Sequence, residues 1–363
     1  MLKARYAAFV CLVLLAASSL RHFTVRAEEF FYVTSLHSVL QYSSTGIASG
    51  SLTGGTLNSA SGIAVDASGN FYVADGSGPA AIHKFSAAGS YVGIFSTNSL
   101  RGPQGVAVDA GGNVFVANLS GGNVLKFAPD GSLQTTYATG GFPFSLAIDG
   151  SGNLYVGDPA LNLIKQISTA GNITTFIGTG SGPTALVQPQ GLTFDASGNL
   201  YVANYGSSNI LKFSADGVQR SVFASTGLDR PIGLDFDTAG NLYVVNNASF
   251  TPAGAHPLAG TVRKFSSTGT DLGTFITSDV AIQSIVIRSS TVVAQPPRLA
   301  ASLVTGGVQL SWPTNAAGYA LETKTALGQG TWLTVNSTPA VQGDRFAVTN
   351  ATSGPAAYFR LRK

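Results

Sequence analysis

The amino-acid sequence predicts an all-β protein made of many short strands, and three observations support this prediction. Charged residues make up only 10% of the 363 residues, whereas 44% are hydrophobic and 44 residues are glycine. Short runs rich in Val, Ile, Phe and Tyr alternate with turns rich in Gly, Asn and Ser. One two-strand pattern also recurs along the chain, and it is most complete between Gly191 and Asn204.

The recurring pattern consists of two β-prone runs joined by a hairpin turn, Asp195-Ala-Ser-Gly198-Asn199. The Asp can bond its own backbone, and the Gly can adopt positive φ. The turn aspartates have spacings of 43, 40, 46 and 42 residues, and they are Asp66, Asp109, Asp149, Asp195 and Asp237. A third strand follows each copy and carries a Lys whose stem we expect to lie between blades: Ile82–Phe85, Val124–Phe127, Ile164–Ile167, Ile210–Phe213 and Val262–Phe265. With a fourth apolar run, the period is that of a β-propeller blade.

The two ends of the repeat region supply one more blade. Phe30–Thr34 and Ser38–Tyr42 match second and third strands with no first strand before them, and Ser284–Arg288 matches a first strand. Joining these segments closes the ring and removes the exposed sheet edges of an open array. The sequence therefore predicts a six-bladed β-propeller closed by strands from both ends.

The repeats resemble a known family. The pattern Pro-Gln-Gly-Leu-Thr-Phe-Asp-x-x-Gly-Asn-Leu-Tyr-Val-Ala-Asn, followed by Asn-Ile-Leu-Lys-Phe, is similar to the NHL repeat, and so is the linker from Thr175 to Pro183. The resemblance covers about residues 30–294. It implies a sensor domain or a platform that binds protein or RNA, and in a few cases an enzyme.

Residues 1–27 resemble a secretory signal peptide. Lys3 and Arg5 precede an apolar run, and Val25-Arg26-Ala27 offers small residues for cleavage before Glu28. The apolar run is short for a membrane anchor, and it holds the only cysteine, Cys11. The mature chain would have no thiol and almost no net charge. Because no dense Lys/Arg stripe is present, we expect a protein that does not bind nucleic acid. The signal peptide predicts export, and we expect no membrane span after its cleavage.

A set of polar residues closes the second strands and forms the first candidate for a ligand site. Second strands should all end on one face of the disc, beside the mouth of the central channel. Turn formation alone accounts for these residue types, but a ring of oxygens at a channel mouth would also suit a ligand. The residues are Asp75, Asn118, Asp158, Asn204 and Asn246.

The fifth repeat departs from the pattern twice. An insertion after Asn246 carries His256 and should emerge on the same face as the Asp/Asn ring, and loops on rigid scaffolds often hold binding residues. Asp235 is the second departure, because the other copies have Ala64, Ala107, Ala147 and Thr193 at its position on the innermost strand. A nearly buried acid needs a partner, so Asp235 is either paired internally or faces channel water. Both departures belong to the candidate ligand site.

No catalytic or metal-binding motif stands out. The Asp-x-x-Gly-Asn turn lacks the later acidic ligand of a calcium loop. His37, His83 and His256 come from unequal positions and are not expected to converge on one zinc ion. Lactonase-like propellers bind metal through Glu, Asn and Asp, but Glu28 and Glu29 are the only glutamates of the mature propeller region. We therefore expect no catalytic residue, no protein metal ligand and no cofactor, with a divalent metal in the central channel as the alternative.

Residues 295–363 form a second predicted domain. The Gln295-Pro-Pro297 segment ends the repeats, and six or seven short strands follow, with Trp312 and Trp332 as aromatic anchors of a small β-sandwich. The segment resembles fibronectin type III-like modules at the C-termini of secreted bacterial proteins. A role as spacer, carbohydrate-binding unit or surface attachment stays open.

Together these observations favour a secreted, non-enzymatic propeller that binds a protein, peptide or glycan through its loop-bearing face. The alternative is a metal-dependent hydrolase or lyase, lactonase-like or similar to amidating lyases, with its site in the channel near Asp235.

Overall fold

The computed structural model of the chain describes residues 26–247, 260–292, 299–304, 307–313, 320–324, 331–335, 337–342, 345–351 and 358–362. The chain divides into two compact units, of which one comprises Glu28–Ser290 and the other contains Thr291–Lys363. The described residues form strands and three short 3-10 helices, so the predicted all-β class is confirmed. None of the described residues forms a helix long and apolar enough to cross a membrane.

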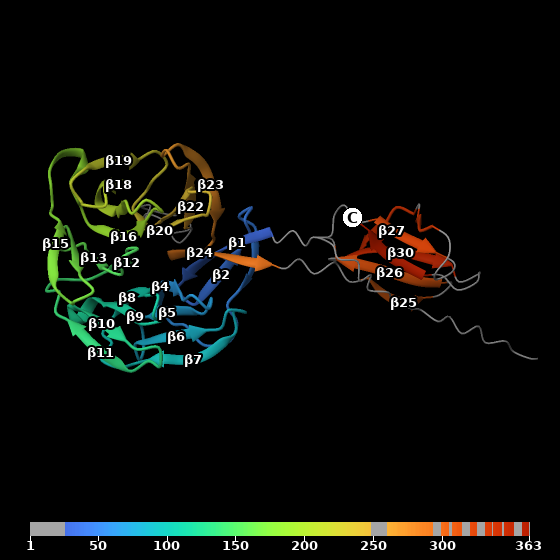
Figure 1. Cartoon of the computed structure of the whole chain (residues 1–363), viewed down its shortest axis with the longest axis horizontal. Coiled ribbons are helices and arrows are strands. Elements are labelled where there is room, and N and C mark those ends of the chain that lie inside the picture. Colours follow the sequence, from blue (N-terminus) through green and yellow to red (C-terminus); the bar gives the residue numbers. More distant parts are fainter. Residues whose placement is uncertain are drawn as a thin grey trace, which may run out of the picture. The chain divides into compact units, whose positions relative to one another are not determined.

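The described residues of the first unit form six four-stranded sheets arranged around a central axis, as in a β-propeller (Figure 1). Each sheet is called a blade below. Five blades are continuous in sequence, and from the innermost to the outermost strand they are β4 (Ala60–Val65), β5 (Phe71–Asp75), β6 (Ala81–Phe85) and β7 (Tyr91–Ser96); β8 (Pro103–Val108), β9 (Val114–Asn118), β10 (Asn123–Phe127) and β11 (Leu133–Tyr137); β12 (Ser145–Ile148), β13 (Leu154–Asp158), β14 (Leu163–Ile167) and β15 (Ile173–Ile177); β16 (Pro189–Phe194), β17 (Leu200–Asn204), β18 (Asn209–Phe213) and β19 (Arg220–Ala224); and β20 (Pro231–Phe236), β21 (Leu242–Asn246), β22 (Thr261–Phe265) and β23 (Asp271–Thr277).

The remaining blade joins the two ends of the repeat region, which confirms the predicted closure. Its strands, from the inside outward, are β24 (Ile282–Val292), β1 (Arg26–Ser35), β2 (Ser38–Tyr42) and β3 (Ala48–Ser51). The Ser284 N–H donates to Thr34 Oγ1 at 2.9 Å, so the last inner strand is fixed to the first strand of the chain. The 3-10 helices are η1 (Leu119–Gly121), η2 (Gly182–Thr184) and η3 (Tyr205–Ser207).

The turn of the repeat has the predicted hairpin geometry, and its Asp organises the surrounding side chains. Gly198 has φ +80°. Asp195 Oδ1 accepts the Asn199 N–H at 2.9 Å, and Oδ2 accepts Asn199 Nδ2 at 2.8 Å and the Tyr201 hydroxyl at 3.3 Å. Burial opposes ionisation, but these bonds and the nearby Lys212 ammonium together hold the pKa of Asp195 below its usual value. Both carboxylate oxygens therefore serve the turn.

Four of the five recurring lysines lie over the aromatic ring of the second strand of their own blade, whereas Lys165 Nζ donates to the Gly140 carbonyl oxygen at 2.8 Å. Lys212 Nζ lies 5.1 Å from the Tyr201 ring centroid and 3.6 Å from Asp195 Oδ2. Lys84, Lys126 and Lys264 lie over Tyr72, Phe115 and Tyr243 in the same way. These cations belong to the blades and do not form a free basic surface.

The inner strands approach one another so closely that most blades need glycine at their second channel position. A Cβ on Gly62 would lie 2.2 Å from the Gln104 carbonyl oxygen, and one on Gly191 would lie 2.4 Å from that of Ile232. Ser145 stands at this position in β12, directly opposite Gly157 of β13. A Cβ atom on Gly157 would lie 2.5 Å from Ser145 Oγ. In other blades the residue opposite the inner-strand Gly is larger than Gly, as is Ala203 beside Gly191. In this blade the inner strand therefore carries the side chain and the second strand carries the glycine, which is the reverse of the arrangement at Gly191 and Ala203.

The described residues of the second unit form two sheets over a small core. The strands are β25 (Ala300–Val304), β26 (Gly307–Pro313), β30 (Arg345–Ala351) and β29 (Ala340–Gln342) in one sheet, and β28 (Leu333–Thr334), β27 (Ala320–Lys324) and β31 (Tyr358–Arg362) in the other. Trp312 is buried in the core with Leu310, Leu321 and Phe359. Trp332, expected as a second anchor, is only partly buried, and Lys324 Nζ lies 5.9 Å from its ring.

The exchange between Ser145 and Gly157 gives a first prediction. Gly157→Ala should lower the free energy of unfolding by about 1 kcal/mol, because the new methyl group meets Ser145 Oγ. In the Ser145→Gly background the same change creates the Gly–Ala pair found at Gly191 and Ala203, so it should be neutral or stabilising. Denaturant unfolding of the two single variants and the double variant measures the coupling. Additive effects would contradict the exchange.

Candidate functional site

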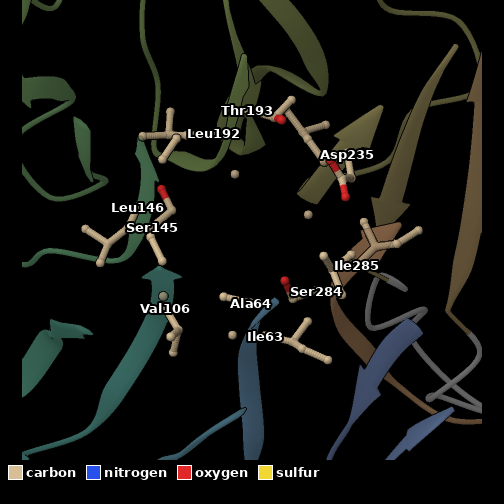
Figure 2. A pocket seen from close by; sticks show the side chains of 18 of the residues that line it. Ile63, Ala64, Val106, Ser145, Leu146, Leu192, Thr193, Asp235, Ser284 and Ile285 are labelled. Carbon is tan, nitrogen blue, oxygen red and sulfur yellow. The ribbon is translucent and has the colours of Figure 1, made fainter. Parts of the chain in front are cut away.

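The central channel of the propeller is a cavity with a volume of about 400 Å³ and a partly polar lining (Figure 2). Its wall is formed by consecutive residues of all six inner strands. These lining segments are 61–65 of β4, 104–108 of β8, 145–148 of β12 with the preceding Phe144, 190–194 of β16, 232–235 of β20 and 283–286 of β24. Because each inner strand pairs on one side only, its free edge also faces the channel.

Side chains line the channel in layers, because the six inner strands have matching register. The first layer, where the strands begin, is the most polar and holds Ser61, Gln104, Phe144, Gln190, Ile232 and Gln283. The third layer is entirely apolar and holds Ile63, Val106, Leu146, Leu192, Leu234 and Ile285. The fourth layer lies opposite the aromatic residue of each second strand, as in the pairs Ala64–Tyr72, Thr193–Tyr201 and Asp235–Tyr243. Asp235 and Thr193 are its polar members.

Asp235 is bonded to backbone groups and also faces the channel, so it combines the two environments that the sequence left open. Its Oδ1 accepts the Phe236 N–H at 2.9 Å, and its Oδ2 accepts the Ile287 N–H of β24 at 2.6 Å. The side chain also lines the channel and is partly exposed to it. Burial raises the pKa of Asp235 to about 7, the two backbone bonds oppose this rise, and nearby Glu29 adds to it. The channel therefore contains a carboxyl group that titrates near neutral pH.

The five residues that end the second strands do not form a ring of available oxygens. All five are buried, and none lines the channel. Asp158 Oδ2 accepts the Phe142 N–H at 3.0 Å, and Asn204 Oδ1 accepts the Val187 N–H at 2.6 Å. Each side chain thus binds the backbone of the loop that enters the inner strand of its own blade. The expectation of a ligand ring is corrected here, because the oxygens are already used. The buried members are Asp75, Asn118, Asp158, Asn204 and Asn246.

The choice between Asp and Asn at these positions follows from the first residue of the third strand. Asn204 Nδ2 donates to Asn209 Oδ1 at 2.9 Å, and Asn246 Nδ2 lies 3.4 Å from Thr261 Oγ1. The Asp-containing blades have Ala81 and Leu163 at the equivalent position, which accept no bond. An amide is therefore used where an acceptor exists, and a carboxylate is used where only N–H donors surround it.

The histidines do not meet. His37 Nδ1 lies 3.3 Å from the Leu57 carbonyl oxygen. His83 Nδ1 lies 3.0 Å from the Tyr91 hydroxyl, and its Nε2 is 3.6 Å from Asp75 Oδ2. His256 and the rest of its insertion lie outside the described residues. Within the residues that the structure describes, no three His, Cys, Asp or Glu side chains lie close enough together to hold a metal ion.

A surface that sequence reasoning missed lies on the face where loops enter the inner strands. Phe142, Leu161 and Val187 are 54%, 44% and 37% exposed, respectively. They are neighbours along one arc: the Gly141 Cβ position is 2.8 Å from Leu161 Cδ1, and the Gln188 N–H donates to Asn162 Oδ1 at 2.6 Å. We call Phe142, Leu161, Val187, Gln188, Tyr205 and Arg230 the loop-face arc. Only the exposed aromatic in Gly-Phe-Pro-Phe144 hinted at it in the sequence.

The arc ends at an aromatic–cation pair. A Cβ atom on Gly206 would lie 2.5 Å from Val187 Cγ1. Val187 therefore packs against η3, the 3-10 helix that contains Tyr205. The Arg230 guanidinium lies 5.9 Å from the Tyr205 ring centroid, and the Arg230 N–H donates to Ser208 Oγ at 3.2 Å. The surface therefore spans three consecutive blades.

Comparisons with known proteins support the fold. No protein-family model matches the chain, and no curated protein matches it. A chain of a nidogen/laminin complex has a TM-score of 0.60 at 20% identity, covering 72% of this chain and 98% of that chain. A Bacteroides caccae protein of unknown function has a TM-score of 0.54 at 13% identity, covering 72% and 99%. A catalytically inactive virginiamycin B lyase from Staphylococcus aureus has a TM-score of 0.49 at 14% identity, covering 81% and 94%. At such low identities, the first two of these likenesses show the β-propeller fold alone.

The environment of Asp235 gives a pH prediction. The folded protein keeps a proton on Asp235 up to about pH 7, whereas the unfolded chain releases it near pH 4, so ionisation costs stability as the pH rises. Between pH 5 and pH 8, wild-type stability should fall by about 2 to 3 kcal/mol more than that of Asp235→Asn. Urea unfolding at both pH values provides the measurement. Parallel pH profiles for the two proteins would show that Asp235 titrates normally.

Proposed function

We propose that this chain is an exported, non-enzymatic, six-bladed propeller of the NHL type that binds a protein ligand through the loop-face arc. Residues 1–27 would direct export, and residues 295–363 would act as a spacer or surface-attachment unit. Peptides and glycans are the other ligand classes that a propeller face can accommodate. The features of the arc favour a protein.

The clustering of exposed apolar side chains carries the proposal. Single exposed hydrophobic residues are common on protein surfaces, but contiguous patches usually mark interaction sites. The arc combines Phe142, Leu161 and Val187 with Tyr205 and Arg230, and Tyr and Arg are enriched among residues that dominate protein interfaces. A protein-binding role is also consistent with the nidogen/laminin complex, whose name describes a protein assembly.

Backbone strain in the arc supports the same conclusion. Gln188 and Arg230 have φ +51° and +49°, and each precedes the proline that starts an inner strand. The equivalent residue before Pro103 is Gly102, with φ +59°, so the fold accepts glycine at this position. A non-glycine residue in this conformation costs roughly 1 kcal/mol. Retaining Gln188 and Arg230 despite this cost is typical of residues with a functional side chain.

The channel supports an alternative function. A carboxyl group with a pKa near 7 suits general acid–base chemistry, and perturbed carboxyl groups in cavities are candidates for catalysis. A hydrolase or lyase that uses a divalent metal would need further ligands beside Asp235. Metal analysis of the purified protein separates the proposals, because a stoichiometric bound metal would favour the enzyme.

The binding proposal predicts the effect of two changes in the arc. Phe142→Ser combined with Leu161→Ser, and separately Arg230→Gly, should weaken binding of the protein ligand at least tenfold. Arg230→Gly should leave the free energy of unfolding within about 1 kcal/mol of wild type, because glycine relieves the strained φ but adds freedom to the unfolded chain. Quantitative capture from the extracellular or surface fraction, followed by titration calorimetry with the retained protein, measures both effects.

The matched control changes equally exposed residues on another surface. Val92 and Ile94 are 61% and 59% exposed on the outermost strand β7. Replacing both with Ser should leave ligand binding unchanged. Equal capture by the arc variants and the control would overturn the proposed surface, and retention of a polysaccharide instead of a protein would overturn the ligand class.

A further inference from the structure

Asp235 is a partly buried acid that has no cation beside it among the described residues. Its carboxylate oxygens each accept one backbone N–H, and no Lys, Arg or His of the described chain forms an ion pair with it. The charged groups around it do not supply one. Glu29 on β1 is an acid, Asp237 lies 3.7 Å from Lys264 Nζ, and Arg288 of β24 donates to the Ala87 carbonyl oxygen. Because an unpaired buried charge is unfavourable, the site favours a cationic ligand when Asp235 is ionised.

The apolar layer above Asp235 restricts the kind of cation. A ligand that enters past the first layer passes a ring of six aliphatic residues before it reaches the fourth layer. Their side chains pack mostly between the blades and are 4–8% exposed, and they are Ile63, Val106, Leu146, Leu192, Leu234 and Ile285. A hydrated metal ion gains nothing from this ring and would find a single carboxylate behind it. A methylene chain would bury apolar surface against it. The ring therefore favours an alkyl chain that carries the charge.

The channel mouth provides polar groups at a suitable separation. Gln104, Gln190 and Gln283 stand on alternate inner strands in the first layer, and their carboxamides form no hydrogen bond with any described residue. Three residue steps along a strand separate this layer from Asp235, or about 10 Å. A volume of about 400 Å³ also lies within the range of small-molecule sites. A chain with polar groups at both ends would contact both layers.

We infer that the central channel binds a linear aliphatic amine, with its ammonium group at Asp235, its methylene chain within the apolar ring and its other polar end at the three glutamines. The shared chemistry fits a free diamine or a lysine side chain presented by another molecule. This site is separate from the loop-face arc, and the inference holds whether or not the arc binds a protein.

Titration calorimetry with cadaverine, the five-carbon diamine, tests the inference. One site should be observed at pH 8, and the affinity should fall roughly tenfold at pH 6 as Asp235 becomes protonated. Asp235→Asn should weaken binding about 10- to 100-fold and remove the pH dependence. Each methylene removed from the diamine should cost about fourfold in affinity. Tighter binding of an Nα-acetylated lysine amide would identify a lysine side chain as the natural source.

Two further variants and two further ligands serve as controls for the cadaverine titration. Asp279→Asn removes an exposed acid of the loop face and should bind cadaverine like wild type. Asp235→Ala introduces the residue that β4, β8 and β12 already have at this layer, so it provides a second folded variant. No binding by wild type, equal binding by both Asp235 variants and wild type, or binding of calcium ions in place of cadaverine would overturn the inference. The five-carbon diol should not bind.

Discussion

The close approach of the inner strands is the constraint on which the rest of the propeller depends. At Gly62 and Gly191 a side chain would meet the backbone of the next blade at 2.2 and 2.4 Å, so the second channel position must stay small. This closeness fixes the width of the channel and the layering of the residues above and below. The two residues that replace Gly at this position are both small: Ser145 lies opposite Gly157, and Ser284 of the closing blade donates its N–H to Thr34 Oγ1. Residue types vary more in the other layers of the channel, and Asp235 lies in the fourth layer.

The elements of each blade could be predicted from the sequence because the interactions that make them are local. The turn at Asp195 is completed by Asn199 and Tyr201, four and six residues away, and Lys212 packs on the adjacent strand. Such contacts repeat with the sequence period, so the pattern alone indicates them. The closing blade could also be predicted, since an open end at each terminus leaves only one way to complete the ring.

The candidate site could be predicted only in part, because its decisive contacts lie between segments far apart in sequence. The repeat shows that Asn204 ends a strand, but not that the loop at Val187 passes over it and takes its oxygen. The pKa of Asp235 depends on Ile287, 52 residues away, and on Glu29 at the start of the chain. Exposure of Phe142 likewise depends on how three loops meet. A residue type at a strand end therefore does not reveal whether its polar atoms are free.

Both proposed sites lie where the chain departs from its own repeat. Gln188 and Arg230 keep side chains at a position where Gly102 suffices, and Asp235 places an acid where three other blades have Ala. The most direct measurement is a carbon-13 NMR titration of the Asp235 carboxyl group, with and without cadaverine. We expect a midpoint near pH 7 for the free protein and a lower midpoint when the amine is bound. A midpoint near pH 4, or one that the amine does not move, would contradict it.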